Sequence, residues 1–261
     1  MNNATEAPAE AKRARINRLL PYLAVFQADV RQTLRSWVYR VWVLLSLLAA
    51  VGCLLYRFGA YRMAGMRPSA PELMSELLEW TVLGSVTLII ILTGGCISSE
   101  RGTMADSVLS RGISRYQYFL GKWHARLVTV VGTYLVFGLI AITGSFFFLH
   151  EDIKILGSLI ALVTVIVLLA GVTTCGVTAS AMCNSTVMGV AILWMVLYGV
   201  GFGLSLLPVR YPTPDYVLTN LPNILRGLYN FAQLGRLILW TVAGSILVAL
   251  VGMCYFSRRD V

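Results

Sequence analysis

Six long apolar stretches run through the chain, and each approaches the length that a helix needs to cross a lipid bilayer. No water satisfies backbone N–H and C=O groups in the hydrocarbon core, so a segment crosses it as a helix of about 20 mostly apolar residues. The sequence therefore predicts an all-α integral membrane fold with six transmembrane helices. We expect these helices at residues 38–56, 80–97, 127–149, 155–182, 187–207 and 237–256.

Charged residues are scarce, and their near-absence from the six stretches narrows the function. Only 13% of the residues are charged, whereas a soluble domain carries about 25%. The stretches contain no Asp or Glu, and Arg40 is their single basic residue. Proton- or ion-coupled carriers keep ionisable groups at membrane depth, where each costs several kcal/mol. We therefore do not expect a proton or cation relay.

The N-terminal part divides into a polar tail and a helix. Residues 1–16 are rich in Ala, Glu and Asn and predict a disordered tail, which leaves 17–261 as a single membrane domain. Over residues 17–37, apolar residues recur every three or four positions, with Arg31, Gln32 and Arg35 off that stripe. This pattern favours a helix lying in the membrane interface before the first span. A plain cytoplasmic extension of that span is the alternative.

The distribution of Lys and Arg predicts the orientation. Cytoplasmic loops retain basic residues, and an inside N-terminus places 14 of the 21 Lys and Arg residues on inner segments. Both termini are therefore predicted to be cytoplasmic. This topology, together with attraction to anionic membrane lipids, accounts for the net charge of +9. The charge gives no reason to expect a nucleic-acid partner.

The connections are short and predict only small elements. In the outer segment 57–79, Glu72, Glu76 and Glu79 at helical spacing predict a short surface helix that feeds the second span. Asn184 or Ser185 is placed to cap the fifth helix. The outer segment 208–236 is interrupted by prolines and predicts one or two short half-inserted helices before the sixth span. A plain surface loop is equally compatible with that segment.

Other patterns in the chain carry little chemistry. Gly199 and Gly203 form a small-xxx-small pair that predicts helix packing, within the chain or against a second copy. The five cysteines lack a C-x-x-C spacing, so neither a disulfide framework nor a metal site is expected. No Ser/His pair, paired carboxylates or H-E-x-x-H sequence occurs in the spans, so no catalytic residue is assigned.

The one long polar connection with strong local signals covers residues 99–122. Thr103 and Asp106 form a capping box that predicts a short helix ending before Gly112. Ser114 and Gln117 form a second box, which begins the helix leading into the third span. The first helix is short and amphipathic, and nothing else in this chain is left to cover its apolar side. It therefore requires the membrane surface or a partner protein.

A family resemblance rests on this connection. The runs Glu100-Arg101-Gly102-Thr103, Val108-Leu109-Ser110-Arg111, Ile113-Ser114-Arg115 and Leu120-Gly121-Lys122 resemble the E-x-x-G-T-x-x-x-L-L-S-x-P-x-S-R-x-x-x-L-x-G-K signature of ABC-2-type transporter permeases. This chain departs from the signature with Gly112 in place of the usual proline and Val108 in place of leucine. The six spans and the N-terminal interfacial helix are similar to the family's layout.

The resemblance implies a multi-subunit assembly in a bacterial inner membrane. The permease would pair with a second permease subunit, often an identical copy, and with two copies of a cytoplasmic ABC ATPase. Gly121-Lys122-Trp123 lacks the remaining residues of a phosphate-binding loop, so ATP and Mg²⁺ would bind to the ATPase and this chain would hold no cofactor. A cytoplasmic coupling helix would lie between the second and third spans. The residues implied for ATPase coupling are Glu100, Arg101, Thr103, Asp106, Arg111, Ser114, Arg115 and Lys122.

These observations lead to one main functional hypothesis and several alternatives. The main hypothesis is the membrane subunit of an ABC exporter that moves an amphipathic or lipid-like solute by alternating access. One alternative is a permease similar to that of nitrous-oxide-reductase maturation, which energises assembly of an extracytoplasmic copper enzyme with the help of an accessory protein. A non-transporting membrane scaffold is the alternative from another class. The sequence does not identify the substrate.

Overall fold

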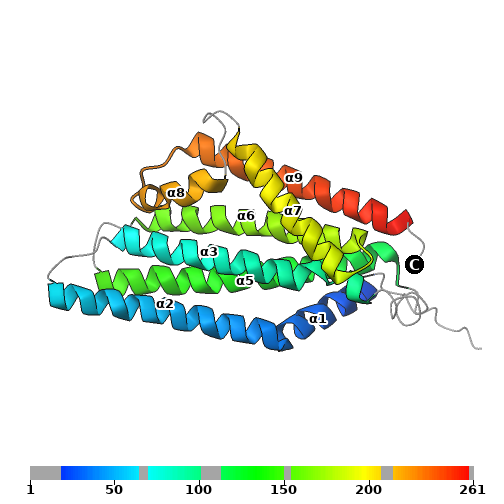
Figure 1. Ribbon diagram of the computed structural model, residues 1–261, viewed down its shortest axis with the longest axis horizontal. Helices are drawn as coiled ribbons and strands as arrows, with labels where there is room; N and C mark the ends of the chain where they lie inside the picture. Colours follow the sequence, from blue (N-terminus) through cyan, green and yellow to red (C-terminus); the bar gives the residue numbers. More distant parts are fainter. Residues whose placement is uncertain (1–18, 65–69, 101–112, 150–153, 207–213, 259–261) are drawn as a thin grey trace, which may run out of the picture.

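The computed structural model describes residues 19–64, 70–100, 113–149, 154–206 and 214–258, and these residues form helices and turns without any strand. The prediction of an all-α chain is therefore confirmed for the described residues. The elements, shown in Figure 1, are α1 (Leu20–Arg35), α2 (Trp37–Ala64), α3 (Ala70–Gly94), the 3₁₀ turn η1 (Ser98–Glu100), α5 (Arg115–Leu149), α6 (Ile155–Met182), α7 (Thr186–Ser205), α8 (Pro214–Leu225) and α9 (Phe231–Arg258).

Each of the six apolar stretches lies within, or closely matches, one long helix. Five helical segments are long and apolar enough to cross a membrane, in α3, α5, α6, α7 and α9. A sixth candidate joins α1 to the first part of α2 across a bend of 57°. The described part of the chain therefore has five or six membrane-compatible helices, as the length and apolarity of the stretches predicted.

The bend between α1 and α2 has a local cause at Ser36. Its backbone has an extended ψ of 131°, and its N–H donates to the carbonyls of Gln32 and Thr33, which ends α1. Because of the bend, α1 is not a straight continuation of α2. It instead packs along the first part of α5 and buries Asp29 and Thr33.

Helix α6 is the centre of the bundle and contacts α3, α5, α7, α8 and α9. Small residues permit these contacts. A Cβ added to Gly157 would collide with the Ile224 carbonyl oxygen of α8. One added to Gly176 would collide with Thr93 of α3.

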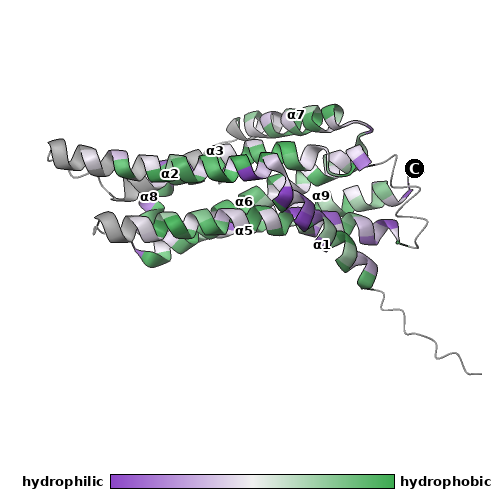
Figure 2. Ribbon diagram, turned by 90° about the horizontal axis from the view of Figure 1, so that it is seen from below, coloured by the Kyte–Doolittle hydropathy of each residue, from purple (hydrophilic) through white to green (hydrophobic). Residues whose placement is uncertain are grey.

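The outer faces of the bundle carry exposed apolar side chains such as Leu45, Met195 and Trp240, as expected for a surface that meets lipid. Figure 2 shows that hydrophobic residues dominate the helices, whereas hydrophilic ones gather around α1 and the helices it crosses.

Several local predictions can be compared with the structure. The Met188 N–H donates to Ser185 Oγ at 3.2 Å, which confirms Ser185 as a cap of α7. The short helix expected in the 208–236 segment is α8, which contains Pro222. The surface helix expected before the second span is not a separate element, because α3 runs from Ala70 to Gly94 without a break. Pro71 stands at the helix start, where it is tolerated, and Gly84 alone does not interrupt the helix.

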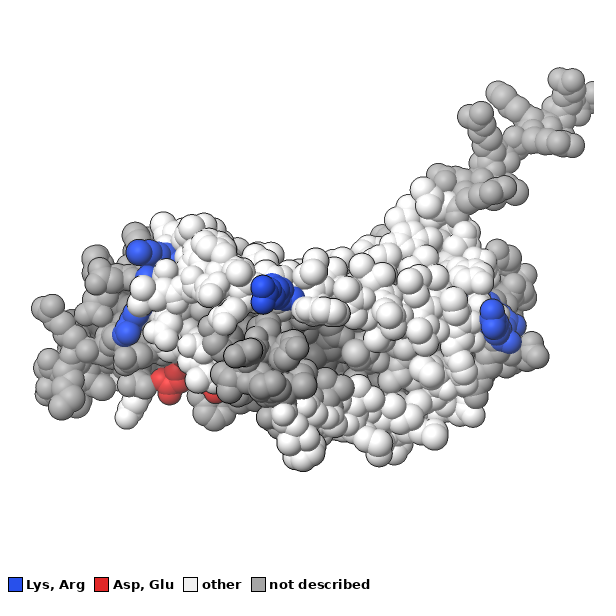
Figure 3. Space-filling view, turned by 90° about the horizontal axis from the view of Figure 1, so that it is seen from above, with Lys and Arg blue, Asp and Glu red and all other residues white. Residues whose placement is uncertain are grey.

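The connections gather at the two ends of the bundle (Figure 1). The first residues of α1, η1, the start of α5, the turn between α6 and α7 and the end of α9 lie at one end. The end of α2, the start of α3, the end of α5, the start of α6 and the whole of α8 lie at the opposite end. On the face shown in Figure 3, uncharged residues cover most of the surface between isolated groups of Lys and Arg. The tail 1–16 and the helix expected between Thr103 and Gly112 lie outside the described residues.

Candidate functional site

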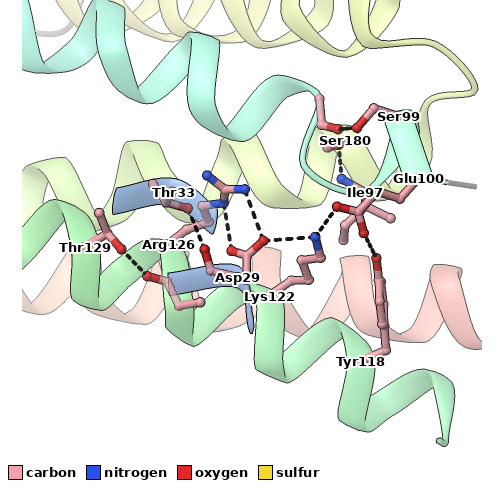
Figure 4. Close-up of polar contacts among 12 residues, drawn as sticks. Asp29, Thr33, Ile97, Ser99, Glu100, Tyr118, Lys122, Arg126, Thr129 and Ser180 are labelled. Atoms are coloured by element: carbon pink, nitrogen blue, oxygen red, sulfur yellow. Dashed lines mark hydrogen bonds and ion pairs between the residues drawn. The ribbon is translucent and has the colours of Figure 1, made fainter. Parts of the chain in front are cut away.

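A buried cluster of charged side chains joins α1, η1 and α5 (Figure 4). Lys122 lies at its centre and is 3% exposed. Its Nζ donates to Asp29 Oδ1 at 2.9 Å and to Glu100 Oε1 at 2.7 Å. One ammonium group therefore connects the N-terminal helix, the turn after α3 and the helix that contains Lys122.

Arg126 completes the cluster on the side of Asp29. Its Nη2 donates to Asp29 Oδ1 at 3.1 Å, and its Nε lies 3.0 Å from Asp29 Oδ2 as an ion pair without hydrogen-bond alignment. Lys122 and Arg126 are four residues apart on α5, so they share one face of the helix. Asp29, which is 1% exposed, thus faces two cations at once.

Glu100 forms the more open side of the cluster. Its side chain is 33% exposed, and both of its oxygens are engaged. Oε1 accepts from Lys122, and Oε2 accepts from the Tyr118 hydroxyl at 2.7 Å. Two carboxylates balance two cations, so the cluster has no formal net charge. Charges in a region of low dielectric constant persist only when they are paired in this way.

The start of α5 places these side chains on one face. The Gln117 N–H donates to Ser114 Oγ at 3.3 Å, and the Ser114 N–H donates to Gln117 Oε1 at 3.1 Å, so the predicted capping box is confirmed. The helix that it begins places Tyr118, Lys122 and Arg126 at intervals of four residues. This spacing aligns them along the side that meets α1 and η1.

The two ends of the segment 101–112 are attached to different helices. On one side, Ser180 Oγ of α6 accepts from the N–H groups of Ile97 at 3.0 Å and Ser98 at 3.1 Å, just before Glu100. On the other side, Arg115 Nη1 donates to the Ser257 carbonyl of α9 at 3.4 Å. The segment is therefore flanked by turns that are bonded to α5, α6, α9 and, through the ion pairs, α1.

An apolar cluster lies beside the ion pairs and supports the same junction. Ile97, Tyr118, Phe119, Val177 and Phe256 are buried together. The rings of Tyr118 and Phe256 are stacked with centroids 6.2 Å apart, which joins α5 to the end of α9. A displacement of η1 or of the start of α5 would therefore disturb both apolar and ionic contacts.

Glycines produce a second close junction, between α3 and α7. A Cβ added to Gly189 would lie 2.5 Å from the Gly94 carbonyl oxygen, so the two backbones meet at this point. By contrast, Gly199 and Gly203 on the outer part of α7 have no described atom within 4 Å of an added Cβ. The predicted packing role of Gly199 and Gly203 is therefore not fulfilled by the described helices of this chain, and a second copy remains as the predicted partner.

The residues predicted for coupling divide into two groups. Glu100, Ser114, Arg115 and Lys122 flank the segment and bond to the protein itself. Arg101, Thr103, Asp106 and Arg111 lie outside the described residues. Sequence reasoning missed Asp29, Tyr118 and Arg126. The sequence held a signal for Arg126 and for an acidic partner such as Asp29. Lys122 and Arg126 place two cations on one face of a helix, and two such cations in an apolar environment require a carboxylate nearby.

Comparison of the chain with protein-family models and with curated proteins finds no match. Within the described residues, no group of three or more His, Cys, Asp or Glu side chains could hold a metal ion. The geometry of the ion-pair cluster and of the segment that it flanks therefore carries the functional argument.

Proposed function

We propose that this chain is the transmembrane permease subunit of an ATP-driven ABC transporter and exports an amphipathic or lipid-like solute. The observation that carries the proposal is the attachment of both flanks of residues 101–112 to the bundle. Glu100 is bonded to Lys122 and Tyr118, and Arg115 is bonded to the end of α9. A segment attached in this way is suited to receive a force and to pass it to several helices.

The ATPase would act on this segment. Arg101, Thr103, Asp106 and Arg111 would lie in the part that contacts a cleft in the ATPase, whereas Ser114 would begin the helix that follows. Glu100 and Lys122 would act from inside, because their contacts hold η1, which directly precedes the segment, against α1 and α5. Movement of the ATPase subunits on binding and hydrolysing ATP with Mg²⁺ would then switch the helices between two packings, inward-open and outward-open.

The proposal includes a topology. The end of the bundle that holds η1 and the end of α9 would face the cytoplasm of a bacterium, with both termini inside. Helix α1 would lie in the inner interface of the membrane, consistent with its angle of 57° to α2. Helix α8 would lie near the outer surface, where an accessory protein could contact it.

A second permease subunit, identical to the first, is part of the proposal. The outer face of α7 offers exposed Met195, Tyr198 and Phe202 next to Gly199 and Gly203. Small residues let helices approach closely in a membrane. This face would therefore meet the second copy or lipid.

Co-purification with a cytoplasmic ABC ATPase tests the proposal. The double change Arg101→Glu with Arg111→Glu reverses two charges in the segment and should abolish ATPase binding and stimulation. The control Arg236→Glu makes one such charge reversal at an exposed site of α9, near the other end of the bundle, and should leave binding intact. Unchanged binding of the ATPase to the double variant would refute the docking assignment.

A further inference from the structure

A groove of about 290 Å³ opens where α1 bends away from α2. It is lined by Val30 and Leu34 of α1, Tyr39 and Val43 of α2, and Gly132 and Val136 of α5. Val136 is 56% exposed and Leu34 is 46% exposed, so the groove is open along its side. Its volume is at the small end of the range of about 300–1,000 Å³ that is usual for ligand sites.

The hydroxyl groups in the wall of the groove all form hydrogen bonds within the protein. Thr133 Oγ1 donates to the Thr129 carbonyl at 2.6 Å, so its proton is used there. The Tyr39 hydroxyl, 2.7 Å from Thr133 Oγ1, must then donate to it. Thr129 in turn donates to the Ala125 carbonyl at 2.8 Å. With these three protons engaged, the groove offers an apolar surface suited to a hydrocarbon chain.

Arg31, Arg35 and Arg40 each directly follow a lining residue of the groove in the sequence. Arg40 follows the lining residue Tyr39, and its Nε donates to the carbonyl of Leu34 at 3.2 Å, across the bend. Arg31 and Arg35 directly follow the lining residues Val30 and Leu34 on α1. All three are exposed, and no carboxylate in the described part of the chain forms an ion pair with them.

We propose that the bend between α1 and α2 is a binding site for one anionic phospholipid. The Arg40 guanidinium binds the phosphate, and Arg31 and Arg35 add attraction for a negative headgroup. One acyl chain lies in the groove between Leu34, Val43 and Val136. The combination of an apolar groove and unpaired arginines favours a lipid over a peptide or a free phosphate. This site does not depend on the proposed transport function.

The site would also set the angle of α1. The lipid would contact Val30 and Leu34 on one face of α1, whereas Asp29 and Thr33 on an adjacent face are buried against α5. A bound lipid would therefore hold the helix that supplies Asp29 to the ion-pair cluster.

Native mass spectrometry of the full chain in mild detergent tests the headgroup. Dioleoyl-phosphatidylglycerol and dioleoyl-phosphatidylcholine are titrated separately, and the first tight lipid adduct is quantified. We expect the anionic lipid to bind more tightly, and Arg40→Gln to weaken its binding about fivefold, from the attraction of about 1 kcal/mol per basic residue near a membrane surface. Arg236→Gln, at another exposed arginine, should leave the affinity unchanged.

A second pair of variants tests the groove. An added Cβ at Gly132 meets no described atom within 4 Å, so Gly132→Leu fills the groove without a backbone clash. We expect this change to weaken the binding of both lipids, because the leucine side chain occupies the space of the acyl chain. Gly244 of α9 is equally open, so Gly244→Leu is the matched control and should bind lipid normally.

Three results would overturn the proposal. The first is equal affinity of the wild-type chain for the two lipids, because the site would then not recognise the headgroup charge, or equal loss in Arg40→Gln and Arg236→Gln, because binding would then follow the general charge of the chain. The second is unchanged binding in Gly132→Leu, because the acyl chain would then lie elsewhere. The third is displacement of the lipid by glycerol 3-phosphate, because the headgroup alone would then be the ligand.

Discussion

The side chains at the junction of α1, η1 and α5 are mostly buried and bonded within the chain, whereas those on the outer face of α7 are exposed. At the junction, Asp29, Lys122 and Arg126 are at most 7% exposed, and their charges are paired with one another. On α7, Met195 is 75% exposed and Phe202 is 69% exposed, and Gly199 faces open space. The charges at the junction are thus paired within the chain, whereas the apolar side chains on the outer face of α7 require lipid or another subunit to cover them.

The difference shows which contacts select one arrangement of the helices in a chain with so few charges. Apolar helix faces attract lipid as readily as one another, so they do not by themselves select one arrangement. A buried carboxylate that faces two cations permits only one position of α1 relative to α5. The ion pairs therefore fix the position of α1, and the glycine contacts fix how closely α3 and α7 approach.

Removal of Asp29 should have the largest effect on stability. Asp29→Asn leaves Lys122 and Arg126 with one carboxylate between them in a buried site, and the expected cost is about 3–5 kcal/mol. The midpoint of thermal unfolding in detergent measures it. The double variant Asp29→Asn with Lys122→Met removes one charge of each sign and should recover part of the loss. If the double variant is as unstable as the sum of the single variants predicts, the pairing does not stabilise the fold.

A single methyl group on the inner face of α7 should have the next largest effect. Gly189→Ala places a Cβ 2.5 Å from the Gly94 carbonyl oxygen, so α3 and α7 must separate at an expected cost of about 1–3 kcal/mol. Gly199→Ala on the same helix meets open space and should be neutral or stabilising, because alanine favours helix by about 1 kcal/mol over glycine. Equal unfolding midpoints for the two variants would contradict the close contact of α3 with α7.

The two glycines also show what the sequence could predict. Long apolar stretches specify six helices, because their length and composition act locally. The caps at Ser114 and Ser185 could be predicted for the same reason, since a cap and its partner are three residues apart. Gly189 and Gly199 both lie within the apolar stretch 187–207, and the packing of α3 distinguishes them.

The identity of Asp29 as the partner of Lys122 and Arg126 could not be predicted, because Asp29 is far from both in sequence. Asp29 and Lys122 are separated by 93 residues and Asp29 and Arg126 by 97. Their contact depends on the bend at Ser36, which turns α1 against α5. Glu100 and Lys122 were predicted as coupling residues from a local motif, and the contact of Lys122 with Asp29 depends on the same folding back of α1.

Loss of the Tyr118 hydroxyl should have a smaller effect. Tyr118→Phe removes the hydrogen bond to Glu100 but retains the ring contact with Phe256, and the expected cost is about 1 kcal/mol, because Glu100 is partly exposed to water. A double-mutant cycle with Glu100→Gln isolates this bond. A coupling energy of zero between the two changes would show that the hydroxyl does not hold Glu100.

Leucines on the outer face of α7 should leave the stability of the single chain nearly unchanged. A Cβ added to Gly199 or Gly203 meets no described atom within 4 Å, and leucine favours helix over glycine, so the unfolding midpoint of Gly199→Leu with Gly203→Leu should stay or rise. If this face meets a second copy, the same variant should reduce crosslinking between two chains in membranes, because the helices could no longer approach closely. Gly244→Leu on α9 serves as the control, since its surroundings are equally open. Unchanged crosslinking in the α7 variant would assign the face to lipid, and lower stability would show that α7 packs inside its own chain.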